Sequence, residues 1–291
     1  MRIRILFSVL SKLAFTSRAS LLQDACGMLA RVNLQSADDV WARIESIARA
    51  RPGGVIATDG DGTLWSGDVG EDLFHAFLEY GRVEPPALEA LRTEARDHRL
   101  SDAGSGVDVA RRIYSAYLEG RYPEEALCEL MAWCFGGWTS EELRGFARDV
   151  VARGGLSARL HGEIVRVLDR ARSAGVAIVL VSASPRAVVV EAGSRVGIGE
   201  DYVVAASPPV EAGVVRAEVA RPIPYGDGKV TRLRERIGSE REVYAAFGDN
   251  SFDVALLASA RVRVAVRPKA RLRARAHEVE GIVELAAEGK G

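Results

Sequence analysis

Residues 55–64 have the sequence VIATDGDGTL, which is the strongest structural signal in this 291-residue chain. The first four, Val55 to Thr58, form a short apolar run that is typical of a buried strand. Pro52 and two glycines break the chain just before it, and a glycine follows each of the next two aspartates. The stretch therefore predicts a buried strand that ends in a tight acidic turn at Asp59 and Asp61.

The hydrophobic pattern after residue 155 alternates between the periods of strands and helices. Continuous apolar runs predict strands over 177–181, 243–247 and 262–266, and helical periodicity predicts helices over 164–174, 186–196 and 252–260. Parallel strands covered on both faces read as unbroken apolar runs. We therefore expect an α/β fold, with a Rossmann-like parallel sheet as its core.

The segment between the first strand and this alternating region has a helical pattern and no convincing strand. It thus interrupts the core rather than preceding it. The predicted division is an N-terminal helical extension over 1–52, a core over 53–68 and 156–291, and an inserted helical cap over 69–155.

The composition limits the kinds of partner. A net charge of -1, from 39 basic and 40 acidic residues, gives no electrostatic reason to expect nucleic acid. No apolar run approaches the roughly 20 residues that span a bilayer. The three cysteines, Cys26, Cys128 and Cys134, have no metal-binding spacing and predict reduced thiols, so we expect a cytoplasmic protein.

The first residues allow two interpretations. Between Met1 and Gln23 the chain has no acid, and its basic residues are Arg2, Arg4, Lys12 and Arg18. This predicts either an amphipathic extension or a targeting or surface-binding segment. After it, residues 36–51 predict a helix that Ser36 caps, with Asp39 three residues on.

Polar side chains follow the predicted parallel strands at the points where these strands end. They are Asp59, Asp61, Ser182, Asp249 and Asp253. Lys229 opens a predicted helix between the strands over 177–181 and 243–247. Open parallel sheets bind ligands beyond the carboxyl ends of their strands, so we expect these side chains to meet at one edge.

These segments resemble, in order, the four sequence motifs of the haloacid dehalogenase superfamily. They are Asp59-Gly60-Asp61-Gly62-Thr63-Leu64, Val181-Ser182, Lys229 and Gly248-Asp249-Asn250-Ser251-Phe252-Asp253. One motif alone is a weak signal, but four in order at strand ends and helix starts are a strong one. The resemblance covers about residues 53–275 and leaves the first fifty unexplained.

The resemblance implies a magnesium-dependent phosphatase that works through an aspartyl-phosphate intermediate on Asp59. Asp59, Asp249 and the backbone carbonyl of Asp61 would bind Mg²⁺, which prefers oxygen ligands. The Asp61 side chain would protonate the leaving oxygen and then activate water. Family members that cleave carbon–halogen bonds lack this second aspartate, so Asp61 favours phosphate chemistry.

The same resemblance gives roles to three further residues. Ser182 and Lys229 would hold the phosphoryl oxygens as charge shifts in the transition state. Asp253 would orient Lys229 or a metal-bound water. Ser184, two residues after Ser182, is a competing candidate for the phosphoryl contact.

Two other phosphate or metal motifs fail on spacing. A calcium-binding loop that starts at Asp59 would need glycine where Leu64 stands and glutamate where Gly70 stands. A P-loop at Lys229 would need glycine at Ile223 and a hydroxyl residue at Val230. A phosphotransferase or phosphomutase, or a non-catalytic phosphate-binding scaffold, remains as an alternative function.

The position of the helical insertion resembles that in phosphoserine and phosphocholine phosphatases, which implies a small phosphorylated metabolite as substrate. Asp68 and Trp65 could read a positively charged nitrogen, by charge and by a cation–π contact. Phosphoserine, phosphoethanolamine and phosphocholine carry such a group. Trp133, Phe135 and Trp138 either add walls to this site or pack the cap helices together.

A run of basic residues near the C-terminus allows two interpretations, a solvated rim or a surface that faces an anion or partner. Its members are Arg261, Arg263, Arg267, Lys269, Arg271, Arg273 and Arg275. Spacing by two scatters them around a helix. Neither the oligomeric state nor the particular phosphomonoester follows from the sequence.

Overall fold

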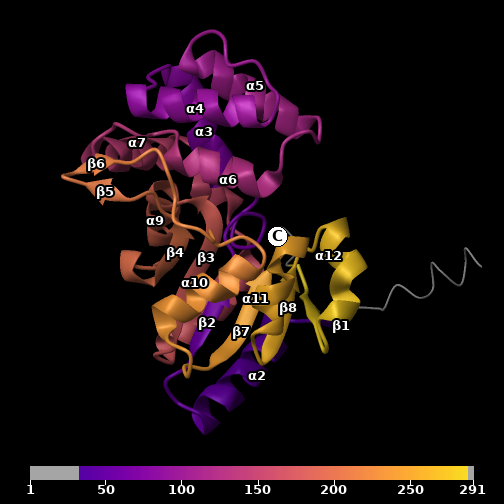
Figure 1. The fold of residues 1–291 in the computed structure, drawn as a ribbon. Helices are drawn as coiled ribbons and strands as arrows, with labels where there is room; N and C mark the ends of the chain where they lie inside the picture. Colours follow the sequence, from indigo (N-terminus) through magenta and orange to yellow (C-terminus); the bar gives the residue numbers. More distant parts are fainter. Residues whose placement is uncertain (1–32, 288–291) are drawn as a thin grey trace, which may run out of the picture.

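A seven-stranded sheet forms the centre of the molecule. The computed structural model describes residues 33–287, and the predicted N-terminal extension up to residue 32, including Cys26, lies outside them. The strand order is β1-β9-β8-β7-β2-β3-β4, and every neighbouring pair is parallel (Figure 1). The strands are β1 Asn33–Gln35, β2 Val55–Thr58, β3 Ala177–Pro185, β4 Val203–Ala206, β7 Val243–Gly248, β8 Val262–Val266 and β9 Val283–Leu285. The predicted Rossmann-like parallel sheet is confirmed.

Helices cover both faces of this sheet, and alternate residues of β2 point to opposite layers. Ile56 packs in one apolar cluster with Ile44 of α2, whereas Val55 and Ala57 pack in another with Leu233 of α10. The helices of the core are α2 Ala37–Ala50, α8 Gly162–Ser173, α9 Arg186–Ser194, α10 Asp227–Ile237, α11 Val254–Ala258 and α12 Ala270–Arg275. Short 3₁₀ turns connect them, at η1 Leu156–Arg159, η2 Glu200–Tyr202, η3 Ser251–Asp253 and η4 Ala276–Glu278. Burial on both faces explains why these strands are apolar without alternation.

The segment between β2 and β3 is helical, as the sequence predicts, and its helices gather over one end of the sheet, with α4 and α5 farthest from the strands (Figure 1). Its helices are α3 Val69–Tyr80, α4 Pro85–Asp97, α5 Gly106–Leu118, α6 Glu124–Trp133 and α7 Ser140–Arg153. Phe135 lies 5.0 Å from the ring of Phe77 and 5.4 Å from that of Trp138. Phe135 and Trp138 therefore pack these helices together rather than lining a ligand site.

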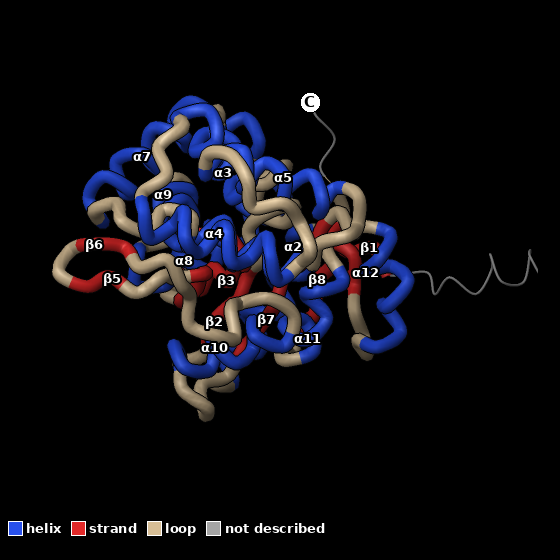
Figure 2. Tube along the Cα trace, turned by 45° about the horizontal axis from the view of Figure 1, so that its top comes forward, coloured by secondary structure: helices blue, strands red, loops and turns tan. Residues whose placement is uncertain are grey.

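A β-hairpin that belongs to the core forms hydrogen bonds with this helical part of the chain. Its strands, β5 Val210–Glu211 and β6 Val214–Val215, project at one side of the molecule (Figure 2). The amide of Gly137 donates to the Val215 carbonyl at 2.9 Å, and the amide of Val215 donates to the Trp138 carbonyl at 2.9 Å. The hairpin therefore pairs through backbone hydrogen bonds, as a neighbouring strand would, with the segment that connects α6 to α7.

The N-terminal part of the described chain belongs to the core. Ser36 caps α2, and the side chain of Asp39 completes the capping box, as the sequence predicts. The sequence assigned residues 1–52 to an extension, whereas the structure adds Asn33–Gln35 to the sheet beside β9. Three residues are too few to show a strand period, which is why the pattern did not reveal this strand. Within residues 33–287, no helix combines the length and apolar character needed to cross a membrane.

Candidate active site

The acidic turn after β2 lies at the centre of the carboxyl edge of the sheet. Strand β2 pairs with β3 on one side and β7 on the other, so Asp59 lies between the ends that carry Ser182 and Asp249. The amide of Asp59 donates to the carbonyl of Phe247 at 3.0 Å. Asp59 is buried, with 3% of the surface of the residue exposed. The topology therefore brings these three residues to one place, as the strand-end argument predicts.

Lys229 reaches the same place from the start of α10 and is fully buried. Its Nζ donates to Oδ1 of Asp59 at 2.6 Å and also to Oδ1 of Asp253. Burial alone would lower the pKa of this lysine, but the charges of Asp253 and Asp59 outweigh it and raise the pKa above its ordinary value. Lys229 is therefore a fixed ammonium group held against Asp59.

Asp253 holds Lys229 and the loop after β7 in place. Its Oδ2 accepts hydrogen bonds from the amides of Asp249, at 3.0 Å, and Asn250, at 2.9 Å. Its Oδ1 accepts from Lys229. Both oxygens of Asp253 are thus engaged, which makes it a residue that positions Lys229 and the loop after β7.

A group of buried carboxylates could hold a metal ion here. One oxygen each from Asp59, Asp249 and Asp253 lie within 4.8 Å of one another. Oδ1 of Asp249 is buried without a hydrogen-bond partner among the described residues. Burial, together with the charge of Asp253, raises the pKa of Asp249 to about 6. A buried, unpartnered carboxylate oxygen is costly, and a cation bound to it would remove that cost.

These donors fit a magnesium ion. All are oxygens, which is the ligand type that Mg²⁺ prefers. Oδ1 of Asp249 is the one carboxylate oxygen of the three residues that has no partner among the described residues, so Asp249 is the side chain best placed as a ligand, with Asp59 beside it. A Cβ at Gly62 would lie 2.1 Å from Oδ2 of Asp249, and its φ of +83° is unfavourable for other residues. Gly62 therefore lets the acidic turn pass close to Asp249.

Three hydrogen bonds fix the side chain of Asp61. Its Oδ1 accepts from Nε1 of Trp65 at 2.8 Å and from the amide of Val69 at 2.7 Å. The hydroxyl of Ser184 lies 2.7 Å from its Oδ2. N–H groups can only donate, whereas a hydroxyl can donate or accept. An exchangeable proton on Asp61 would thus sit on Oδ2, beside Ser184.

Trp65 supports this aspartate instead of facing a ligand. Its side chain is fully buried, and a Cβ at Gly60 would lie 2.9 Å from its ring. The ring therefore offers no open face for the cation–π contact expected from the sequence. The indole N–H holds Asp61, a role that spacing alone does not reveal.

Asp68 is close enough to Asp61 for their charges to interact, and it also caps the start of a helix. Its Oδ1 accepts from the amide of Glu71 at 2.8 Å, so it is the N-cap of α3. Burial and the charge of Asp61 raise the pKa of Asp68 well above its ordinary value. This carboxyl group is therefore half-buried beside a second one, where a positive charge would stabilise both.

The two serines of β3 have different partners. Ser184 is engaged with Asp61, whereas Oγ of Ser182 accepts from the amide of Ser184 at 3.1 Å. Among the described residues, the Ser182 hydroxyl has no acceptor for its own proton. Ser182 is thus the serine with a donor available for an incoming oxygen.

Two residues at the site were not singled out for it by the sequence. Oγ1 of Thr63 donates to Oδ2 of Asp59 at 3.0 Å. Nζ of Lys269 lies 2.9 Å from Oδ2 of Asp249. Lys269 follows the end of β8, so the strand-end rule could have found it. In the sequence, Lys269 was grouped with the C-terminal run of basic residues, and other members of that run form surface ion pairs, such as Arg273 with Glu284.

A cavity of about 780 Å³ opens beside this site. Tyr117 and Glu124 line it from the helical layer, and Asn250, Lys269 and Arg271 line it from the core. Asn250 follows Asp249 in the chain and Lys269 contacts it, so this cavity lies next to the carboxylates.

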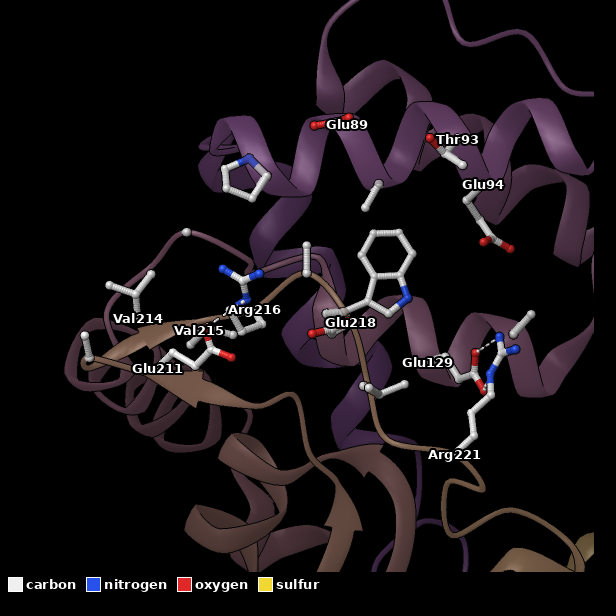
Figure 3. A pocket seen from close by; sticks show the side chains of 18 residues that line it. Glu89, Thr93, Glu94, Glu129, Glu211, Val214, Val215, Arg216, Glu218 and Arg221 are labelled. Atoms are coloured by element: carbon white, nitrogen blue, oxygen red, sulfur yellow. Dashed lines mark hydrogen bonds and ion pairs between the residues drawn. The ribbon is translucent and has the colours of Figure 1, made fainter.

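A second cavity, of about 800 Å³, lies away from the carboxylates between α4, α6 and residues 211–221 (Figure 3). Trp133 lines it, and its walls carry several glutamates with Arg216 and Arg221. Arg221 binds Glu129 through two hydrogen bonds, of 2.8 and 2.6 Å. This ion pair joins the core to α6, so the cavity marks where the two parts of the chain are held together.

Comparisons with known proteins agree with the geometry. A family model described as haloacid dehalogenase-like hydrolase matches residues 56–258. The chain is similar to a solved protein of unknown function from Bordetella pertussis Tohama I, with 21% identity and a TM-score of 0.61 over 80% of this chain and 97% of that one. A functionally unknown protein from Anaerococcus prevotii DSM 20548 has 14% identity and a TM-score of 0.59, over 89% and 98%. A HAD family hydrolase from Salmonella enterica serovar Typhi has 14% identity and a TM-score of 0.50, over 84% and 75%. No curated protein matches the sequence.

Proposed function

Because the chain belongs to the haloacid dehalogenase-like hydrolase family, we propose that it is a magnesium-dependent phosphomonoester hydrolase that works through an aspartyl-phosphate on Asp59. The observation that carries this proposal is the unpartnered Oδ1 of Asp249, buried beside Asp59 while Lys229 is held against that carboxylate. The site therefore combines a buried carboxylate oxygen that has no hydrogen-bond partner among the described residues with the fixed positive charge of Lys229. It suits a dianionic phosphoryl group better than a neutral substrate.

The residues divide the reaction into two displacements. In the first, an oxygen of Asp59 forms a bond to phosphorus, the ester P–O bond breaks, and Asp61 gives its proton to the leaving oxygen. In the second, Asp61 takes a proton from water as the water attacks the phosphoryl group, and phosphate leaves Asp59. When bound by Asp59 and Asp249, Mg²⁺ would reduce the repulsion between the carboxylate and the phosphoryl oxygens.

The remaining residues hold the phosphoryl group and the acid. Lys229 presents its ammonium beside Asp59, and Ser182 has a hydroxyl proton to donate. Both can stabilise charge on phosphoryl oxygens. Trp65 and the amide of Val69 keep Oδ1 of Asp61 occupied, which leaves Oδ2 to carry the exchanged proton.

A panel of phosphorylated metabolites tests this function. We expect inorganic phosphate to appear in a one-to-one ratio with substrate loss, in the presence of Mg²⁺. If phosphate instead moves to a second hydroxyl and none is released, the chain is a phosphotransferase or phosphomutase. If no phosphorylated compound reacts and only phosphate binding is found, the scaffold alternative is favoured.

Replacement of Asp61 by Asn should slow both displacements. Asn keeps an oxygen that can accept from Trp65 and Val69, so the local structure should persist, but it cannot transfer a proton. General acid–base groups typically contribute about 10²- to 10⁴-fold to the rate. We expect a loss of this order in kcat, measured by phosphate release. The loss should be smaller for an aryl phosphate, whose leaving oxygen needs less protonation; an equal loss for alkyl and aryl esters would contradict the assignment.

The substrate is proposed to be a small phosphomonoester with a positively charged nitrogen, such as phosphoserine, phosphoethanolamine or phosphocholine. The support is the carboxyl group of Asp68, whose pKa is raised well above its ordinary value by burial and by the charge of Asp61, both of which a cation would offset. Tyr117 and Glu124 also line the adjoining cavity. These two groups make the helical side of that cavity polar.

Replacement of Asp68 by Asn tests this substrate class cleanly. Asn is as good an N-cap as Asp, so α3 should keep its start while the charge is lost. We expect KM for the amine substrate to rise roughly tenfold, the effect of one partly buried charge pair, and KM for an uncharged aryl phosphate to stay within about twofold. Equal losses for both substrates, or a wild-type preference for sugar phosphates, would exclude Asp68 as a reader of the substrate.

A further inference from the structure

Lys269 holds the outer oxygen of the proposed magnesium ligand. Its Nζ lies 2.9 Å from Oδ2 of Asp249, and its amide donates to the carbonyl of Asp249 at 2.8 Å. The other oxygen of the same carboxylate, Oδ1, is the buried atom without a partner. One carboxylate thus has an ammonium group beside one oxygen and, among the described residues, no hydrogen-bond partner on the other.

The two lysines of the site differ in how freely their side chains can move. Lys229 is fully buried, and its ammonium is held by both Asp59 and Asp253. The side chain of Lys269 is 55% exposed and lines the cavity that leads to the site. Lys269 can therefore turn away from Asp249 toward the cavity, whereas Lys229 cannot.

A cation on Oδ1 and an ammonium on Oδ2 would repel each other across a single carboxylate. A phosphoryl dianion that enters through the cavity would give the ammonium an alternative partner. We propose that Lys269 is a placeholder for the divalent cation: it neutralises Asp249 in the metal-free protein and turns to the phosphoryl group when substrate enters. Metal and phosphate then bind cooperatively, since each removes an obstacle to the other. This inference rests on the proposed magnesium-dependent function.

Calorimetric titration of Mg²⁺ tests the placeholder without any turnover. The proteins are wild type, Lys269→Met, which keeps the apolar stem, and Arg271→Gln as matched control. Arg271 lines the same cavity but pairs with Glu124, at 3.5 Å, instead of Asp249. Each titration is made without phosphate and with saturating inorganic phosphate, and thermal unfolding verifies that each variant is folded. Lys269→Gln serves as a second variant should the methionine perturb the rim.

Without phosphate, we expect Lys269→Met to bind Mg²⁺ roughly tenfold more tightly than wild type, because one repelling charge is gone. With phosphate, the two dissociation constants should converge, and Arg271→Gln should behave like wild type throughout. Equal or weaker Mg²⁺ binding by Lys269→Met, or a gap that persists in phosphate, would overturn the placeholder and leave the proposed function standing. Absence of Mg²⁺ binding in every protein would overturn both.

Discussion

Asp59→Asn is expected to lower kcat by about 10⁴-fold or more, because an amide oxygen cannot serve as the nucleophile that accepts the phosphoryl group. Of the three neighbouring buried carboxylates, Asp59 is the one that follows the central strand between β3 and β7. Asp253 is engaged with two amides and Lys229, and Asp249 would hold the metal ion. Phosphate release from the best substrate of the panel measures the loss. Turnover within about tenfold of wild type would contradict the assignment of the nucleophile.

The stability of the same variant provides its control. Burial raises the pKa of Asp59 well above its ordinary value, despite the opposing charge of Lys229. A raised folded-state pKa means that stability is present at low pH and is lost as the carboxyl group ionises. The neutral Asn should therefore leave the metal-free Tm unchanged or raise it, while Lys229 keeps its bond to Asp253. A marked fall in Tm would mean that lost activity reflects unfolding.

Chelation is expected to abolish turnover, and added Mg²⁺ to restore it. Without the divalent cation, Asp59 and Asp249 have only lysine partners, and no metal charge draws the phosphoryl oxygens to Asp59. Mg²⁺ should also stabilise the protein: at about 100 times its Kd a ligand contributes roughly 2.7 kcal/mol, which is about 5 °C in Tm for a chain of this size. Asp249→Asn should remove most of this shift.

Calcium provides the control for metal identity. Ca²⁺ is larger and takes more ligands in a less strict geometry than Mg²⁺. We expect it to raise Tm but to inhibit turnover in competition with Mg²⁺. Full activity after exhaustive chelation, or equal turnover with Ca²⁺, would contradict the proposed role of the metal.

The fold and family could be predicted because the signals are local. Asp59, Ser182 and Asp249 each end an apolar run, and the ends of parallel strands must meet at one edge. The apolar runs and the residues that follow them can be read from the sequence without knowledge of tertiary contacts. The family match over residues 56–258 confirms the resemblance drawn from the four motifs.

The finer parts of the site could not be predicted because they depend on tertiary contacts. Nothing in the spacing of Trp65 shows that its ring is buried and its N–H holds Asp61. The two serines of β3 differ by the hydroxyl contact of Ser184 with Asp61, which is set by the path of the chain into α3. Lys269 resembled the other basic residues around it until the structure placed it beside Asp249. In each case the residue type was visible in the sequence and its partner was not.

The central claim is that the phosphoryl group passes through Asp59. The most direct test is an acid quench during turnover of a phosphate-labelled substrate, followed by digestion and mass analysis of the labelled peptide. The proposed function predicts an acid-stable, base-labile phosphoryl group on the peptide that contains Asp59, with more label in Asp61→Asn than in wild type and none in Asp59→Asn. A label on Ser182, or turnover with no labelled protein in any of the three, would contradict it.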